Sequence, residues 1–184
     1  MSFEIRPLTS ERWDDFVDLF ERRGPRGGHR NSPGPGCWCM YWRDRNVPHG
    51  DPKKRAMAKL VRSGRETGLL AYDGGNVVGW VSVAPREEYA AILSSPQYGP
   101  RDDDDEGVWA IVCFVVDKPE HGRGVREALL AGAVEHAFAR SATAVEAYPH
   151  VSAPHDYMGG VELYRRAGFA HVRDANKRAV VRLT

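Results

Sequence analysis

Alternating and periodic apolar residues divide the N-terminal part of the chain into one strand and two helices. Apolar and polar side chains alternate from Phe3 to Leu8, which is typical of a strand. Apolar residues from Trp13 to Phe20 then recur every three or four positions, so a helix with one apolar face follows and should dock on a sheet. A second helix is expected from about Lys53 to Arg62.

The middle of the chain predicts a hairpin. Residues 68–71 and 77–84 have the composition of strands, and the sequence Asp73-Gly74-Gly75-Asn76 between them is typical of a tight turn. The two strands should therefore run antiparallel. A short helix is expected at residues 86–93.

The clearest pattern is a strand, a helix and a second strand in the other half of the chain. Val108 to Val116 is apolar at nearly every position, as expected for a strand covered on both faces, and residues 125–140 form a helix with a broad apolar stripe. A further strand at 143–148 follows this helix, so the two strands should run parallel. Ligands of such units bind at the carboxyl ends of the strands.

The remaining elements complete one mixed α/β domain over residues 1–184. A helix at 160–167 ends at Gly168, and strands at 170–173 and 178–183 close the chain. This order of elements predicts a mixed sheet with helices on both faces. The composition agrees, because 184 residues with 42% hydrophobic and 28% charged content suit one sizeable core.

Charge and hydropathy argue against several classes of protein. The 26 Lys and Arg residues against 25 Asp and Glu give a formal net charge of +1, which removes the electrostatic footprint that nucleic-acid binding needs. The longest apolar run, Val108 to Val116, is shorter than the ~20 residues of a membrane-spanning helix. No basic region followed by an apolar stretch begins the sequence, so we expect no secretory signal and a cytoplasmic location. The three cysteines are too few for a disulfide scaffold.

One turn has a composition that suits an anion. Gly122 and Gly124 lie between the buried strand and its helix, where backbone N–H groups have no intrahelical partner and the helix dipole is positive. Arg123 and Arg126 add charge. The alternative is that the two glycines only shape a tight turn. A Rossmann fingerprint fits worse, because Glu127 occupies the position of its third glycine, and no lysine followed by Ser or Thr makes a P-loop.

This turn and a second motif together resemble the GNAT superfamily of acyl-CoA-dependent N-acetyltransferases. The two motifs are His-Gly-Arg-Gly-Val at 121–125 and Leu-Tyr-Arg-Arg-Ala-Gly-Phe at 163–169. The resemblance implies a twisted, mostly antiparallel sheet of about seven strands whose central parallel pair splays apart. It also implies acetyl-CoA as co-substrate, bound in that splay, and it allows for a homodimer because dimers are frequent in the family.

The same resemblance assigns the residues that would bind acetyl-CoA. Main-chain groups of Phe114 and Val116 would pair with the pantetheine arm, and the backbone of residues 121–126 would bind the pyrophosphate. Three positions depart from the family's usual residues: His121, Arg126, and Tyr157, which replaces an asparagine that often contacts the CoA arm. The expected CoA-binding residues are Phe114, Val115, Val116, His121, Gly122, Arg123, Gly124, Val125, Arg126 and Tyr157.

Tyr164, within the second motif, would by this resemblance protonate the departing CoA thiolate. A phenol with a pKa of about 10 carries its proton at pH 7 and can donate it, although the same residue would also serve as a packed helix aromatic. Because no glutamate lies on 108–116, the base used by one branch of the family is absent. The remaining candidates for the base, acting directly or through water, are Glu146, His150, His155 and Asp156, although a surface histidine needs no such role.

An aromatic segment, residues 37–42, is expected to line the acceptor pocket. Trp38, Tyr41 and Trp42 would form an apolar wall there or pack over the core, and Tyr148 is a fourth candidate for substrate contact. The acidic run 102–106 is expected to be a solvated loop, with attraction of a cationic substrate as its alternative.

No metal is expected. His29, Cys37, Cys39 and His49 are zinc ligand types, but Cys-x-Cys in a segment expected to be strand-like has the wrong spacing for a zinc knuckle.

The resemblance to the GNAT superfamily implies transfer of an acetyl group from acetyl-CoA to a primary amine, which we expect to belong to a small molecule and to attack directly. Main-chain N–H groups near Val116 would stabilise the oxyanion. Cys113 is embedded in an apolar strand, which disfavours the thiolate that an acyl-enzyme would need. A protein or peptide amine, or another acyl-CoA, is the alternative within the enzyme class. A non-catalytic module that binds or senses acyl-CoA is the alternative outside it.

Overall fold

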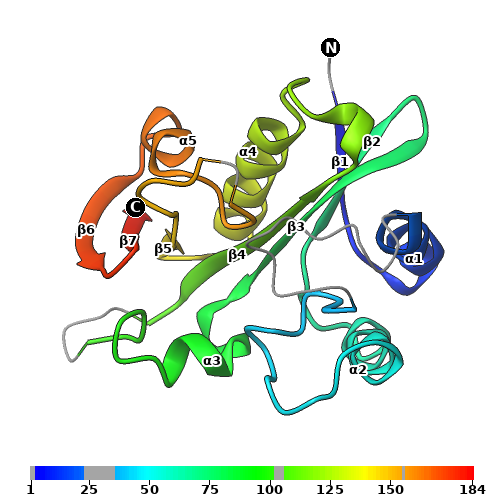
Figure 1. Cartoon of the computed structure of the whole chain (residues 1–184), viewed down its shortest axis with the longest axis horizontal. Helices are drawn as coiled ribbons and strands as arrows, with labels where there is room; N and C mark the ends of the chain where they lie inside the picture. Colours follow the sequence, from blue (N-terminus) through cyan, green and yellow to red (C-terminus); the bar gives the residue numbers. More distant parts are fainter. Residues whose placement is uncertain (1–2, 23–35, 102–105, 155) are drawn as a thin grey trace.

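The computed structural model describes residues 3–22, 36–101, 106–154 and 156–184. Within them the strands form one seven-stranded sheet in the order β1-β2-β3-β4-β5-β7-β6 (Figure 1). Every neighbouring pair is antiparallel except β4 and β5, which confirms the predicted mixed sheet with one parallel pair. The strands are β1 (Glu4–Pro7), β2 (Leu69–Asp73), β3 (Asn76–Pro85), β4 (Val108–Val116), β5 (Ala144–Ala147), β6 (Ala170–Ala175) and β7 (Arg178–Leu183).

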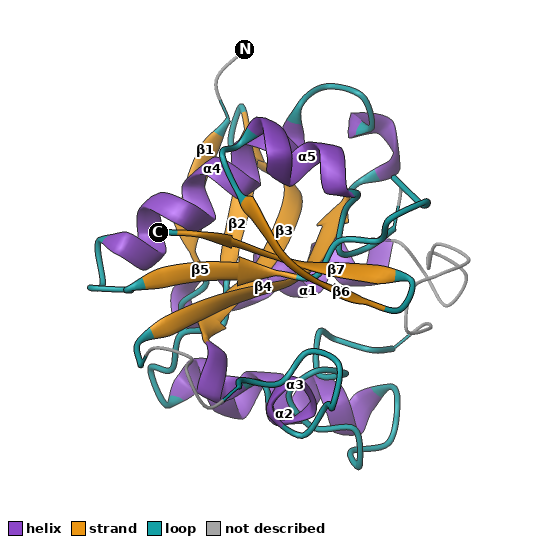
Figure 2. Cartoon of the chain, turned by 90° about the vertical axis from the view of Figure 1, so that its left-hand side faces the viewer, coloured by secondary structure: helices purple, strands orange, loops and turns teal. Residues whose placement is uncertain are grey.

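Helices cover both faces of the sheet. The helices are α1 (Trp13–Arg22), α2 (Asp51–Arg62), α3 (Ala90–Leu93), α4 (Val125–Phe138) and α5 (Val161–Arg166). Figure 2 shows α4 and α5 on one side and α2 and α3 on the other. Buried residues of α1, α2 and α3 belong to one core cluster, and those of α4 and α5 belong to a second. The sheet therefore separates two cores, as the order of the predicted elements requires.

A glycine in β3 sets how closely α4 approaches the sheet. A Cβ on Gly79 would lie 2.8 Å from Cγ1 of Val125 and 3.0 Å from Cδ1 of Leu129, so only glycine fits beneath the first turns of α4. This close packing fixes the start of α4 beside the carboxyl end of β4.

The expected strand-like conformation of residues 37–42 is wrong. The segment forms consecutive turns, and Trp38 and Cys39 have positive φ angles of 47° and 52°. One local bond and one tertiary contact hold it in this shape: Met40 N–H donates to Cys37 O at 2.9 Å, and Trp80 Nε1 of β3 lies 3.0 Å from Cys39 Sγ. The short helix expected at 86–93 is also divided, into a 3-10 turn at Arg86–Glu88 and α3. Among the described residues, no helix combines the length and the apolar character needed to cross a membrane.

Candidate active site

The site is built where β4 separates from β5. The two strands pair only between Val108–Ile111 and Ala144–Ala147, so the second half of β4 has no strand partner on that side. A bulge opposite Ser82 and Val83 interrupts β4 at the same place, and bulges are common next to active sites. The splayed parallel pair that the resemblance implies is therefore present.

Main-chain groups of β4 point into this splay. Asp117 N–H donates to Val78 O of β3 at 2.9 Å, so the alternation of the strand directs the N–H and C=O groups of Phe114 and Val116 to the opposite edge. Phe114 N–H donates there to Tyr157 O at 2.6 Å, and Val116 O lies 3.1 Å from His121 Nε2. A pantetheine arm bound along this edge must displace both partners from β4.

The glycine turn has the geometry of an anion site. Gly122 and Gly124 have φ angles of 80° and 84°, and an added Cβ at either residue would meet no atom within 4 Å. Glycine is needed there for its conformation rather than for space. The first helical bond runs from Ala128 N–H to Gly124 O, so the N–H groups of Val125 and Arg126 project from the start of α4 without a helical acceptor. These residues fit a phosphate.

The two arginines of this turn differ in their surroundings. Arg123 forms ion pairs with Asp73, at 2.8 Å, and with Glu120, and these hydrogen bonds raise its pKa. Arg126 Nη1 donates to Pro154 O at 3.2 Å, and its guanidinium lies 5.8 Å from the ring centroid of Phe114. Arg126 therefore bridges the splay without a carboxylate partner among the described residues, whereas the charge of Arg123 is already balanced.

Tyr164 lies on α5 and contacts the segment that includes Tyr157 and Met158. Its side chain is fully buried, its hydroxyl donates to Met158 O at 2.8 Å, and its ring packs against Phe169. Burial raises the pKa of Tyr164, and the charges of Arg126 and Arg178 oppose that shift. The phenol is therefore protonated, and it donates its hydrogen bond to the loop next to the splay.

The candidate bases that the structure describes are occupied by hydrogen bonds. The buried Glu146 carboxylate accepts from Arg86 at 3.2 Å, from Arg182 at 2.7 Å and from the Tyr148 hydroxyl at 3.1 Å. His150 Nδ1 accepts from Ser152 N–H at 3.1 Å, which places the proton of the neutral ring on Nε2.

Asp156 forms a two-point ion pair with Arg178, at 2.8 and 3.0 Å. His155 lies outside the described residues. So do His29 and residues 102–105 of the acidic run 102–106.

A pocket of about 480 Å³ lies beside Tyr157. Tyr41 and Trp42 line it, whereas Trp38 packs against Phe16 and Phe20 of α1. Tyr148 is fully buried and does not line the pocket; it contacts the lining residue Tyr98, whose ring centroid is 5.5 Å away, and its main-chain oxygen accepts from Arg178. The pocket is lined by Tyr41, Trp42, Arg45, Ala91, Ser94, Ser95, Pro96, Gln97, Tyr98, Tyr157 and Arg178.

Sequence reasoning missed eight of these eleven residues, among them Arg45, Tyr98 and Arg178. Tyr98 and Arg178 are far from the aromatic segment in sequence, and nothing local marks them as pocket residues. Arg45 had a usable signal, because it follows the aromatic segment 37–42 by three positions and lies beside a proline-rich loop.

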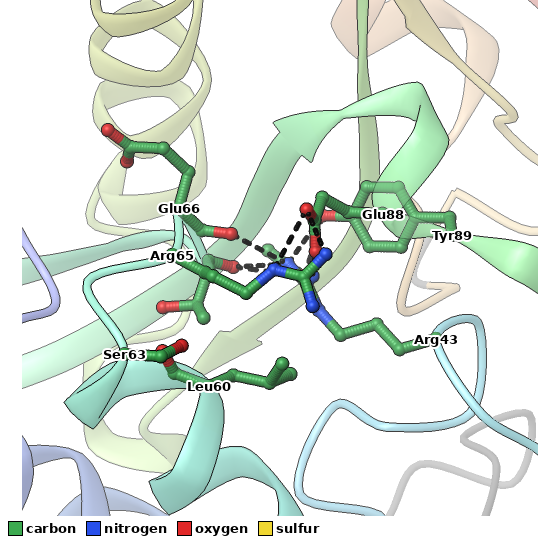
Figure 3. Close-up of polar contacts among 9 residues, drawn as sticks. Arg43, Leu60, Ser63, Arg65, Glu66, Glu88 and Tyr89 are labelled. Carbon is green, nitrogen blue, oxygen red and sulfur yellow. Dashed lines mark hydrogen bonds and ion pairs between the residues drawn. The ribbon is translucent and has the colours of Figure 1, made fainter.

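A buried arginine anchors the wall of the pocket to the sheet (Figure 3). Arg43 Nη1 pairs with Glu88 at 3.3 Å, and Nη2 donates to Glu66 O at 3.3 Å and Thr67 O at 3.2 Å. Its guanidinium also lies 4.6 Å from the ring centroid of Tyr89, whose pKa burial raises to about 12. Arg65 pairs with the same Glu88 carboxylate at 2.7 Å from the exposed side.

No group of three or more His, Cys, Asp or Glu side chains suited to a metal ion occurs within the described ranges. Burial raises the pKa of the Cys37 thiol to about 11, so the thiol carries its proton at neutral pH.

Comparison with known proteins identifies the family. The model of the acetyltransferase (GNAT) family matches residues 34–169, which is most of the chain, and the protein therefore belongs to that family. Among curated protein sequences, none matches the chain significantly.

Solved structures with this fold cover nearly the whole chain. An N-acetyltransferase from Staphylococcus aureus Mu50 has 13% identity and a TM-score of 0.60 over 100% of this chain and 98% of its own. The PaiA N-acetyltransferase from Thermoplasma acidophilum, in complex with coenzyme A, has 12% identity and a TM-score of 0.59 over 99% and 98%. A ribosomal-protein-alanine N-acetyltransferase from Brucella melitensis has 17% identity and a TM-score of 0.56 over 97% and 96%. At these identities the likeness concerns the fold alone.

Proposed function

We propose that the protein transfers an acetyl group from acetyl-CoA to a primary amine of a small molecule by direct attack. The observation that carries this proposal is the glycine turn at the start of α4, placed next to the splayed end of β4. The turn supplies backbone donors for a pyrophosphate, and the splay supplies strand-like main-chain groups for a pantetheine arm. The coenzyme A bound to the Thermoplasma neighbour supports this ligand.

In the proposed reaction, the amine nitrogen bonds to the thioester carbonyl carbon and the C–S bond breaks. The amine loses one proton, and the CoA sulfur gains one. Main-chain N–H groups at the end of β4, near Val116, stabilise the oxyanion, and Tyr164 protonates the thiolate. Because Glu146 and His150 are engaged as described above, we propose that water or a group outside them accepts the proton of the amine.

The acceptor is proposed to enter the pocket beside Tyr157. Its size suits a small molecule, since ligand pockets span roughly 300–1,000 Å³. Tyr157 lines this pocket, and its main-chain oxygen accepts from Phe114 N–H of β4, which supports the proposal that the acceptor approaches the thioester from this side.

The direct test is thiol release from acetyl-CoA by the purified full chain against a panel of amines, peptides and antibiotics. We expect amine-dependent release of one thiol for each acetylated product, identified by mass spectrometry. Binding of acetyl-CoA without any transfer across the panel would contradict catalysis and support the alternative of an acyl-CoA sensor. Acetylation of peptides alone would contradict the small-molecule acceptor.

Tyr164→Phe is expected to lower kcat about tenfold or more while leaving acetyl-CoA affinity nearly unchanged. The phenol contributes only when thiolate charge develops, so its removal affects the transition state rather than the bound substrate. The measurements are kcat in a regime limited by chemistry and the Kd of CoA by calorimetry.

Tyr89→Phe is the matched control for this variant. Tyr89 is also fully buried with a hydrogen-bonded hydroxyl, but it lies in the Arg43 network. It should lose about 1 kcal/mol of stability and keep its kcat. A Tyr164→Phe variant with the wild-type kcat would show that Tyr164 has only a packing role.

A further inference from the structure

The proposed acceptor pocket does not suit a polycationic amine such as a polyamine, because its charged lining residues are positive rather than negative. None of the described residues that line the pocket is Asp or Glu, and two of them are arginines, Arg45 and Arg178. An ammonium group deep in this pocket would find no carboxylate among the lining side chains.

Among the described residues, only one of the two arginines lacks a carboxylate partner. Arg178 is neutralised by the buried Asp156, and it also donates to Tyr148 O at 3.0 Å. Arg45 has no carboxylate partner among the described residues, and the neighbouring Asp44 accepts from Asn46 N–H. The Arg45 guanidinium instead lies over the rings of Tyr41 and Trp42, 4.7 and 5.2 Å from their centroids. Stacking in this way leaves the N–H edge of a guanidinium available to an anion.

The rest of the wall is aromatic. Trp42 meets Tyr98 edge to face at 5.7 Å, and Tyr157 completes a set of four aromatic residues around the pocket. Such a wall favours a flat apolar body. A guanidinium at its edge pairs with a carboxylate in two-point geometry.

We propose that the acceptor is a primary amine that carries both an aromatic group and a carboxylate, and that Arg45 binds this carboxylate. The inference rests on the proposed acetyl transfer and specifies the class of acceptor. The aromatic body lies among Tyr41, Trp42 and Tyr98, and the amine faces Tyr157 and the edge of β4. Arg45 is thus a specificity-determining residue that does not touch the thioester.

The test compares matched acceptors that differ only in the carboxylate: tryptophan with tryptamine, and tyrosine with tyramine, with spermidine as the polycation. With the full chain and acetyl-CoA, kcat/KM for each amino acid should exceed that of its decarboxylated partner by about tenfold or more. Arg45→Gln should remove this preference by raising KM for the amino acids, with little change in kcat or in the values for tryptamine and tyramine. Arg62→Gln, which makes the same charge change at an exposed position of α2, should preserve it.

Calorimetry in the presence of CoA separates this inference from the proposed function. If tryptophan binds more tightly than tryptamine and Arg45→Gln abolishes this difference, the pocket assignment is supported even without acetyl transfer. The absence of transfer would then overturn catalysis alone. Transfer without a carboxylate preference, a preference that survives in Arg45→Gln, or spermidine as the best acceptor would overturn the inference and leave acetyl transfer standing. If neither acetyl transfer nor selective binding were observed, both proposals would be overturned.

Discussion

Replacing Gly124 with valine is expected to weaken acetyl-CoA binding by about tenfold to a hundredfold. At a φ of 84° a β-branched residue is strained, by roughly 1–2 kcal/mol relative to the ordinary helical region. The turn relieves that strain by rotating, which moves the N–H groups of Val125 and Arg126 away from the pyrophosphate. Each hydrogen bond lost to a charged group costs about 1.5–3 kcal/mol. Titration calorimetry with CoA measures the change.

Gly64→Val is the matched control for Gly124→Val, because it introduces the same backbone strain away from the proposed pyrophosphate site. Gly64 follows α2, has a φ of 74°, and an added Cβ would also meet no atom within 4 Å. Both variants should lower the melting temperature to a similar extent, but only Gly124→Val should lose CoA affinity. Unchanged affinity in Gly124→Val would show that the pyrophosphate binds elsewhere.

The parts of the site that follow from local sequence could be predicted. The apolar run of β4, the two glycines and the stripe of α4 are consecutive in the chain, so their order alone defines a strand, a turn and a helix. The positive φ angles at Gly122 and Gly124 follow from the same local pattern.

The acceptor side could not be predicted in the same way. Tyr41, Tyr98, Tyr157 and Arg178 come from four separate segments, and only the packing of those segments brings them around one pocket. The shape of residues 37–42 also depends on tertiary contact, because Trp38 and Cys39 adopt positive φ angles that their residue types do not indicate.

The sequence also does not predict which charged residues form pairs in the fold. Glu146 is a reasonable base when considered alone, but it is paired with Arg86 and Arg182, which are 60 and 36 residues away. The bond between Phe114 and Tyr157 is another such contact. It joins the edge proposed for pantetheine to a segment that is distant in the sequence.

Replacing Arg43 with methionine is expected to lower the free energy of unfolding by about 3 kcal/mol. The guanidinium is only 3% exposed and binds two main-chain carbonyl groups and the Glu88 carboxylate, so its removal leaves buried acceptors without donors. Arg43 also connects the segment that carries Tyr41, Trp42 and Arg45 to the start of β2. The acceptor KM should therefore rise in the same variant, whereas CoA affinity should not change. Chemical denaturation and steady-state kinetics measure these effects.

Arg65→Met is the matched control, because it removes the second guanidinium from the same Glu88 carboxylate. The side chain of Arg65 is 54% exposed, and an exposed ion pair contributes about 0–1 kcal/mol. This variant should be nearly as stable as the wild type and should keep its acceptor KM. If both variants lost the same stability, the ion pair with Glu88 would account for the effect. The bonds from Arg43 to the carbonyl groups of Glu66 and Thr67 would then not be what anchors the pocket wall. A large loss in Arg43→Met alone would show that the bonds from Arg43 to the carbonyl groups of Glu66 and Thr67 hold the pocket wall against the sheet.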